Sequence, residues 1–298
     1  MLSLHTNVAS LSAQNSLSRT QSSLSTSMTR LSTGYRINSA MDDAAGLQIA
    51  TRLKAQTSGM SVAMRNTQNS ISMLQTADGA LNEVNNILTR MKDLATQSAD
   101  GSSSADDQTA MQSEYNSLTD ELSNIFSNTK FGGTKLLNTD GTSKLSTATG
   151  ITFQIGADSS ETMTANFSAE LTSVNSSIST ATSATYAGDG SLAATPSAGT
   201  DLTTTAGANA AIGNLSTAID AVSTLRSKLG AVSNRLDHVY NNLSNISSNT
   251  QAATGRIMDV DFATESSSMT SNQMLMQAGT AMLKQTNSMS SMVMSLLQ

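Results

Sequence analysis

A run of apolar residues at heptad spacing constrains the fold of this chain more than any other feature. Steps of three and four residues alternate without a break through Val222, Leu225, Leu229, Val232, Leu236, Val239, Leu243 and Ile246. On an α-helix these positions form one continuous apolar stripe. Because a stripe of this length is stable only when other helices cover it, the sequence predicts a helical bundle.

Two earlier segments have mostly the same spacing. The first contains Leu53, Met60, Met64, Thr67, Ile71, Leu74, Leu81 and Leu88, and the second contains Met111, Tyr115, Leu118, Leu122 and Ile125. Between them, "SADGSSSADDQT" has the Gly, Ser and Asp typical of a turn and of helix N-caps. We therefore expect three long helices in one antiparallel bundle.

Both ends of the chain carry a further amphipathic stripe. Its apolar members are Leu4, Val8, Leu11, Leu17, Leu24, Met28 and Leu31 at one end, and Leu275, Met282, Met289, Val293 and Leu296 at the other. Gly279 and Thr286 occupy the remaining heptad positions of the second stripe. We expect the stripes to be partners and also to contact other copies, because the rest of the chain is too small to bury both. Contacts between different patches generate a helical polymer when their rotation does not close.

The helical period stops between about residues 131 and 210. "FGGTKLLNTDGTSKLSTATGITFQIGADSSETMTANF" contains an Asp-Gly turn and the β-prone residues Ile151, Phe153 and Ile155, which predict one or two hairpins. From about Thr172 to Ala210 the chain is almost all Ser, Thr, Ala, Gly and Asn, and we expect it to be loosely structured.

Composition narrows the classes of function. The 298 residues include 17 Met but only 3% aromatic residues, no Trp and no Cys, which suits an elongated helical body and removes thiol chemistry. A net charge of -6 offers no basic face for nucleic acid. No stretch approaches the ~18 apolar residues of a membrane span. The first 21 residues also lack the basic start and apolar run of a cleavable secretory signal, so none is expected.

Several segments resemble bacterial flagellin, in the order and spacing of that family. "NVASLSAQNSLSRTQSSLSTSMTRLSTGYRINSAMDDAAGLQIATRL" is similar to its N-terminal segment nearly residue for residue. "FGGTKLL" and "FQIGAD" resemble its hairpin region, and "GRIMDVDFATES" resembles the entry to its C-terminal helix. One departure is the C-terminal "KQTNSMSSMVMSLLQ", which has Thr286 where the family has Ala and lacks the usual Pro. Its Met enrichment has two interpretations. The simpler one is core filling, and the other is adaptable packing or oxidation sensitivity.

The resemblance implies a mainly α fold, with an elongated antiparallel helical bundle, a small β-hairpin region and terminal helices that form a coiled coil in a filament. It implies an N-terminal core helix and spoke at 1–44, bundle helices and hairpins at 45–170, a Ser/Thr-rich surface insert at 171–210, a returning bundle helix at 211–254, and a spoke and C-terminal core helix at 255–298. The implied function is that of a structural, non-enzymatic subunit of the extracellular swimming filament.

Partners are implied in the same way. They are further copies of the chain with or without sister flagellins, an export chaperone that grips the C-terminal helix, the filament cap, and the flagellin-sensing Toll-like receptor of hosts through Arg90, Leu94 and Glu114. The polymerisation residues are Leu4, Val8, Leu11, Leu24, Met28, Leu31, Leu275, Met282, Met289, Val293 and Leu296. No cofactor, nucleic acid or membrane insertion is expected, and the resemblance implies secretion by a dedicated flagellar system.

Two acidic stretches, the function and the Ser/Thr-rich insert each have an alternative interpretation. In "INSAMDDAAG" we expect Asn38 or Ser39 to cap the next helix, with Asp42 and Asp43 in its first turn, rather than a catalytic carboxylate pair. "RIMDVDF" is interpreted as a joint rather than a metal site, because neither histidine has ligand spacing. A hook-filament junction protein is the alternative function, and the His-Glu-x-x-His pattern of a protease insert is absent. Ser and Thr between about 140 and 210 are either O-glycosylated or merely solvated.

Overall fold

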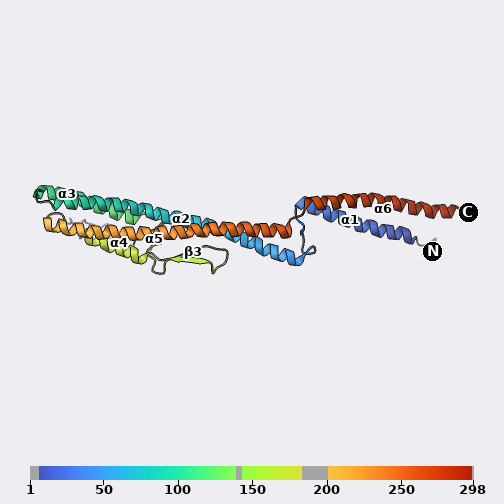
Figure 1. Ribbon diagram of the computed structural model, residues 1–298, viewed down its shortest axis with the longest axis horizontal. Coiled ribbons are helices and arrows are strands. Elements are labelled where there is room, and N and C mark those ends of the chain that lie inside the picture. Colours follow the sequence, from blue (N-terminus) through green and yellow to red (C-terminus); the bar gives the residue numbers. More distant parts are fainter. Residues whose placement is uncertain (1–6, 139–142, 183–200, 297–298) are drawn as a thin grey trace. The chain divides into compact units, whose positions relative to one another are not determined.

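Helices dominate the computed structural model, which describes residues 7–138, 143–182 and 201–296. The helices are α1 (Val8–Thr33), α2 (Ala44–Ser98), α3 (Ala105–Asn128), α4 (Ser168–Ala181), α5 (Thr205–Met258) and α6 (Phe262–Leu296) (Figure 1). The chain divides into two compact units, one formed by residues 1–57 and 248–298, the other by residues 58–247. The expected mainly α fold with a small hairpin region is confirmed. Among the described residues no helix is long and apolar enough to cross a membrane.

The second unit is a helical bundle whose core is the heptad stripe expected from the sequence. In α5, Val222, Leu225, Leu229 and Leu236 are buried, while Val232 and Val239 are half-buried and Ile246 is exposed at the end of the stripe. The matching core residues are Leu74, Leu81 and Leu88 of α2 and Tyr115 and Leu122 of α3. Burying one such side chain stabilises a fold by roughly 1.5–3 kcal/mol, so this stripe is a main source of the bundle's stability.

A capping box starts α3 after the turn that the sequence predicted. The Ser104 side chain accepts a hydrogen bond from the backbone N–H of Asp107, and the Asp107 carboxylate accepts one from the backbone N–H of Ser104. Hydrogen bonds from the Ser104 side chain and backbone lower the pKa of Asp107 below its usual value. Two of the otherwise unsatisfied donors at this helix end are thereby satisfied.

Two short antiparallel hairpins follow α3, as the sequence predicted. Strand β1 (Lys130–Phe131) pairs with β2 (Thr134–Lys135) across Gly132 and Gly133, which both adopt positive φ. Strand β3 (Ile151–Gln154) pairs with β4 (Thr162–Ala165), and Phe153 lies opposite Met163. Both of these side chains are buried in the bundle core. The predicted Asp-Gly turn at residues 140–141 lies outside the described residues.

Helix α4 contradicts the expectation that the chain is loosely structured from about Thr172. Its residues Leu171, Val174 and Ile178 are buried, with the i, i+3, i+7 spacing of one helix face. Three apolar side chains among Ser and Thr gave a weak sequence signal, and burial in the bundle core supplies the missing stabilisation. Helix α4 ends at Ala181 and α5 begins at Thr205, and both lie partly within the range 171–210 expected for the insert. Residues 183–200 lie outside the described part.

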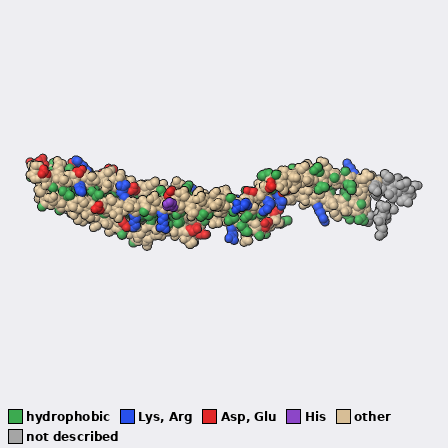
Figure 2. Space-filling model, viewed as in Figure 1, with side chains coloured by type: hydrophobic (Ala, Val, Ile, Leu, Met, Phe, Trp, Pro, Cys, Tyr) green, Lys and Arg blue, Asp and Glu red, His purple; other side chains and the backbone are tan. Residues whose placement is uncertain are grey.

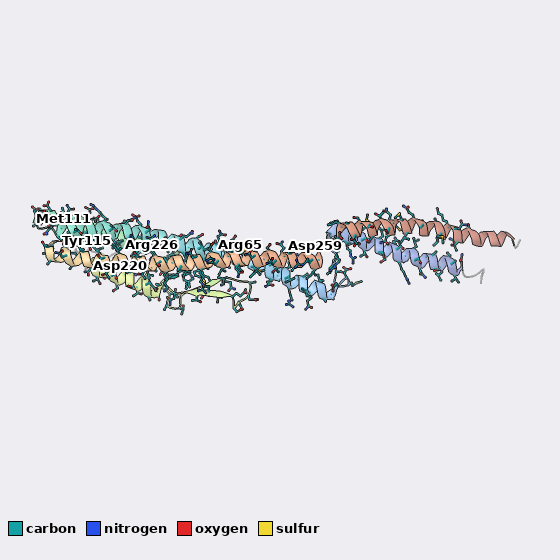
Figure 3. All side chains as sticks on the ribbon, viewed as in Figure 1. Arg65, Met111, Tyr115, Asp220, Arg226 and Asp259 are labelled. Carbon is teal, nitrogen blue, oxygen red and sulfur yellow. The ribbon has the colours of Figure 1, made fainter. Side chains whose placement is uncertain are left out.

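The segment between α4 and α5 leaves and rejoins the bundle through hydrogen bonds to buried side chains. The Tyr115 hydroxyl donates to the carbonyl oxygen of Ala181 at 2.7 Å. Ser98 Oγ donates to the carbonyl oxygen of Leu202 at 2.6 Å, and the backbone N–H of Leu202 donates to Gln112 Oε1 at 2.6 Å. Burial and the nearby Asp201 charge both raise the pKa of Tyr115, which stays protonated. Figure 3 labels Tyr115 and Met111 on the bundle. Both ends of the segment are thus fastened beside α3.

Ion pairs join α5 to its neighbours within the bundle. Arg226 Nε donates to Asp78 Oδ1 of α2 at 2.8 Å, and Lys228 Nζ donates to Glu170 Oε1 of α4 at 2.6 Å. Partial burial of Glu170 opposes its ionisation, but the bonds from Lys228 and the backbone outweigh burial and lower its pKa. Both pairs are half-exposed, so they orient helices more than they stabilise them.

Candidate functional site

The terminal helices α1 and α6 pack against each other in antiparallel orientation, which confirms that the two ends are partners (Figure 1). Near one end of the pair, Asn7 Nδ2 donates to the carbonyl oxygen of Thr286 at 3.3 Å. Near the other, Arg30 and Glu265 form an ion pair at 3.7 Å. The pair therefore stays in register over almost the whole of α1.

The contact between α1 and α6 uses small and polar residues as well as leucines. Leu24 and Ser27 of α1 are buried, and Leu17 lies so close to Gly279 that a Cβ there would approach Leu17 Cδ1 at 3.2 Å. Gly279 and Thr286 are half-buried on α6. Because such a contact buries little apolar surface, it is a weak source of stability for two isolated helices.

The sequence-predicted stripes divide between this contact and solvent. Leu24 and Leu31 turn toward the partner helix, whereas the large apolar residues that stay exposed are Val8, Leu11 and Met28 of α1 and Leu275 and Met282 of α6. We call these five exposed residues the outward face; they project at several angles around the two helices rather than along one line. Leu4 lies outside the described residues, and so do the side chains of Met289, Val293 and Leu296.

The surface around the outward face is polar but carries few charges. Figure 2 shows hydrophobic side chains distributed along the helix pair among mostly uncharged surface. Residues 18–31 contain only two charged residues, Arg19 and Arg30, and residues 272–295 contain only Lys284. Several exposed large apolar residues on one pair of helices are consistent with an interaction site, and sparse charge allows several copies of such helices to lie side by side without strong repulsion.

Two short backbone segments connect the helix pair to α2 and α5, and they lie side by side. Tyr35 and Asp259 form an antiparallel bridge. The backbone N–H of Arg36 donates to the carbonyl oxygen of Met258 at 2.6 Å. The backbone N–H of Val260 donates to the carbonyl oxygen of Gly34 at 3.0 Å. Gly34 ends α1 with a φ of 76°, a conformation that glycine adopts without strain. We call residues 34–43 and 259–261 the paired connector.

The acidic residues of the paired connector accept hydrogen bonds from nearby backbone. Asp42 Oδ2 accepts from the backbone N–H groups of Ser39 and Asn38 at 2.8 and 3.1 Å, and these bonds together with the Ser39 hydroxyl lower the pKa of Asp42. Asp43 Oδ1 accepts from the N–H of Gly46 at 2.9 Å. Asp43 therefore caps α2. The expected cap at Asn38 or Ser39 was wrong, because these residues instead form a turn closed by Asp42.

Asp261 caps the start of α6, as Asp43 caps α2. Its carboxylate accepts from Thr264 Oγ1 at 2.8 Å and from the backbone N–H of Ala263 at 3.0 Å, and these bonds lower its pKa. Within the described residues there is no group of three or more His, Cys, Asp or Glu able to hold a metal ion. The connector carboxylates Asp42, Asp43 and Asp261 thus act as helix caps and turn acceptors.

Arg90 and Glu114 meet on the bundle surface. Arg90 Nε and Nη2 both donate to Glu114 Oε1, at 2.9 and 2.7 Å, and both side chains are exposed. Leu94 does not join them at the surface, because it is only 2% exposed and belongs to the bundle core. The receptor contact expected at Leu94 stays a prediction, and in this structure its side chain is not accessible beside Arg90 and Glu114. In the monomer it supports the helix that presents Arg90.

Sequence reasoning missed two features of the helix pair. The Arg30–Glu265 ion pair has a local signal, since Arg30 lies in the last turn of α1 and Glu265 in the first turn of α6. Met274 is also exposed, next to the outward face, but it falls outside the heptad positions from which the stripe was identified. Strict heptad counting therefore underestimated the width of the apolar surface.

Comparison with known proteins identifies the family. Residues 4–144 match the bacterial flagellin N-terminal helical region, and residues 212–297 match the bacterial flagellin C-terminal helical region. Flagellin A of Vibrio anguillarum is 35% identical and is aligned over 100% of both chains, and the flagellin of Bacillus subtilis (strain 168) is 39% identical over 98% of each.

A solved flagellar hook-associated protein from Vibrio parahaemolyticus has a TM-score of 0.53 at 18% identity, covering 73% of this chain and 100% of that one, which shows a shared fold alone. Full-length similarity to flagellins does not favour the junction protein as an alternative. Two matched regions that cover most of the sequence, with whole-chain relatives, show that this chain belongs to the bacterial flagellin family.

Proposed function

We propose that this subunit of the bacterial flagellar filament polymerises through the outward face of its terminal helix pair. The observation that carries the proposal is that α1 and α6 already pair within the chain yet leave Val8, Leu11, Met28, Leu275 and Met282 exposed. A second copy is the occupant expected, since like helices with sparse charge pack in parallel without strong repulsion. Leu4, Leu24, Leu31, Met289, Val293 and Leu296 complete the proposed coiled coil of the inner tube.

The chemistry of the outward face suits an open polymer. Patches on two different helices form a heterologous contact with a neighbouring copy, and such a contact extends indefinitely when its rotation does not close. Residues 1–44 and 255–298 then form inner tube and spokes, with the bundle outside them. The role proposed is structural rather than enzymatic, in keeping with the flagellin family.

Charge substitutions on matched faces of one helix test this proposal. Leu275→Asp places a charge on the outward face, and Gln277→Asp places the same charge on an exposed position about 200° around α6. Seeded polymerisation followed by electron microscopy should show loss of filaments for Leu275→Asp and normal filaments for Gln277→Asp. Normal filaments from both variants would remove the outward face from assembly.

Recognition of the monomer by a flagellin-sensing Toll-like receptor is proposed at Arg90 and Glu114. The support for this receptor site is that the forked Arg90 donor and the Glu114 acceptor are both exposed, on α2 and α3. Arg90→Ala should cost about 1–3 kcal/mol of receptor affinity, as hot-spot truncations do. Arg65→Ala, which removes an exposed arginine elsewhere on α2, is the control. Equal receptor activation by the two variants at sub-saturating dose would reject the site.

Export through a dedicated flagellar secretion system without a cleaved signal is also proposed, with the filament cap placing each subunit. Its support is the match of both terminal regions to those of bacterial flagellins. Before assembly the exposed Leu275 and Met282 of α6 offer an apolar surface for an export chaperone. Intact mass of filament-derived protein tests the signal, since a removed leader beyond the initiator Met contradicts it. Leu275→Asp should lose chaperone binding if the chaperone contacts the apolar surface of α6.

A further inference from the structure

Methionines are distributed unequally between the two units of this chain. In the bundle, the described side chains of Met60, Met91, Met111 and Met163 are buried and those of Met64 and Met73 are half-buried. In the helix pair, Met28, Met274 and Met282 are 51%, 59% and 64% exposed, and Met41 of the paired connector is 97% exposed. All exposed methionines among the described residues therefore belong to the unit that contains the outward face.

An exposed thioether reacts with a peroxide by oxygen-atom transfer. A sulfur lone pair attacks one oxygen of hydrogen peroxide, an S–O bond forms and the O–O bond breaks. The departing hydroxide takes the proton of the transferred hydroxyl group and leaves as water. Sulfur loses two electrons and the peroxide gains them, so the reaction needs no further reductant or oxidant. The product is a sulfoxide, a polar group with a strong hydrogen-bond acceptor, in place of an apolar one.

We propose that Met28, Met274 and Met282 form an oxidant-reactive modification site, at which sulfoxide formation by peroxide blocks addition of the subunit to the filament. The inference rests on the proposed assembly face, because these side chains lie on or beside it. Val8, Leu11 and Leu275 on the same helices have no comparable reactivity. Oxidation therefore changes three defined points of an otherwise inert apolar surface.

The effect on assembly follows from burial of an unsatisfied acceptor. In the assembled polymer each sulfoxide oxygen enters an apolar contact, where an unpaired polar group is unfavourable. We expect the critical concentration for polymerisation to rise at least about tenfold when all three side chains are oxidised. The same residues are covered by neighbouring copies once assembly is complete, so the modification acts on monomers and leaves preformed filament largely unreacted.

Limited peroxide treatment of the full-length monomer, followed by tryptic mass spectrometry, measures reactivity at single residues. Cleavage after Arg19 and Arg30 releases Met28 as the only methionine of its fragment, and cleavage after Arg36 and Arg52 isolates Met41 in the same way. Met28 should react at a rate close to that of Met41, whereas buried Met60 should react much more slowly. Fragmentation of peptide 257–284 assigns Met274 and Met282. In filaments all three proposed sites should be protected relative to monomer.

Seeded assembly of oxidised protein then tests the consequence. Oxidised wild-type chain should lose assembly, whereas peroxide should leave the critical concentration of the triple variant Met28→Leu, Met274→Leu, Met282→Leu equal to that of the same variant before treatment, because Leu resists oxidation. Met41→Leu is the matched control and should remain peroxide-sensitive. Peroxide sensitivity of the triple variant equal to that of wild type would overturn the assignment, as would normal assembly of wild type carrying all three sulfoxides.

Untreated Leu275→Asp, run in parallel, separates this proposal from the assembly proposal. If Leu275→Asp fails to assemble while oxidised wild type assembles normally, the modification site alone is wrong. If Leu275→Asp assembles normally, the outward face is not an assembly surface, and both proposals are wrong.

Discussion

The bundle and the helix pair are both built from amphipathic helices, but they treat their apolar residues differently. In the bundle, Leu74, Leu122 and Leu225 from three helices have no exposed surface, so each helix covers the others. In the helix pair, Leu24 is buried while Leu11 and Leu275 remain in solvent. The difference teaches that similar sequence periodicity serves two purposes, internal folding in one unit and contact with further copies in the other.

The two regions also differ in what holds their helices together. The bundle has a broad core that includes both aromatic and branched side chains, whereas the helix pair is joined by polar contacts such as Ser10 to Asn287 and Arg30 to Glu265. Hydroxyl and amide contacts on an exposed surface contribute little net stability. The comparison therefore predicts an independently stable bundle and a helix pair whose stability depends on assembly.

Removal of the helix pair is the strongest test of this contrast. Deleting residues 1–40 and 256–298 should abolish filament formation and leave a soluble helical protein with cooperative unfolding, since the bundle core lies within residues 58–247. Circular dichroism and electron microscopy of the truncated and full-length chains provide the measurement. Filaments from the truncated chain, or an unfolded product, would break the comparison.

Truncation of one leucine in each region gives the next largest effect. Leu94→Ala in the bundle core should lower the free energy of unfolding by about 2–5 kcal/mol, because it leaves a cavity. Leu11→Ala, at a side chain that is 54% exposed, should change monomer stability by less than about 0.5 kcal/mol. Urea unfolding of both variants measures the difference. Similar losses would mean that the outward face is already covered in the monomer.

Acid should act on the helix starts through carboxylates with lowered pKa. The pKa of Asp42 and that of Asp261 lie below the usual 3.8, so their stabilising contribution is complete above that pH and is lost as pH falls through their folded pKa values. NMR titration of the backbone amides of Ser39 and Ala263 should follow this loss below pH 3.8. Asp42→Asn and Asp261→Asn should remove the respective transition. Asp107→Asn provides the matched change at a bundle helix. A transition above pH 3.8 would contradict the sign of the shifts.

The smallest expected effect concerns the exposed pair of Arg90 and Glu114. Because both side chains are solvated, their coupling energy should be about 0.2–1 kcal/mol of bundle stability. A double-mutant cycle with Arg90→Ala and Glu114→Ala measures this coupling directly. A value well above that range would show that surface polar contacts hold the bundle as well as its core does.

The bundle was the more predictable region because its periodic residues all meet one another. The stripe from Val222 to Leu243 and its counterparts in α2 and α3 were assigned from spacing alone, and a turn with N-cap residue types before α3 followed from local composition. Helix α4 escaped prediction because only Leu171, Val174 and Ile178 interrupt its Ser and Thr. The stability of this helix comes from burial in the core, which a local sequence pattern does not reveal.

The candidate site was less predictable because spacing does not state which side of a stripe is covered. Leu24 and Met28 belong to one apolar stripe, yet the partner helix buries the first and leaves the second exposed. The resemblance implied a receptor contact at Leu94 together with exposed Arg90, but Leu94 lies one turn away from Arg90 with its side chain in the core. Tertiary packing fixes the rotation of each helix about its axis, so residue type and sequence distance were insufficient to predict which side chains are exposed.

The fastening of Ala181 and Leu202 beside α3 has a consequence for how this chain changes during evolution. Since Tyr115, Ser98 and Gln112 fix both ends of the intervening segment, its length is uncoupled from the geometry of the bundle. Each doubling of such a segment costs only about 0.6 kcal/mol of closure entropy. Insertions at residues 183–200 therefore leave the folding of the bundle nearly unaffected, which makes this position a natural acceptor for additional sequence.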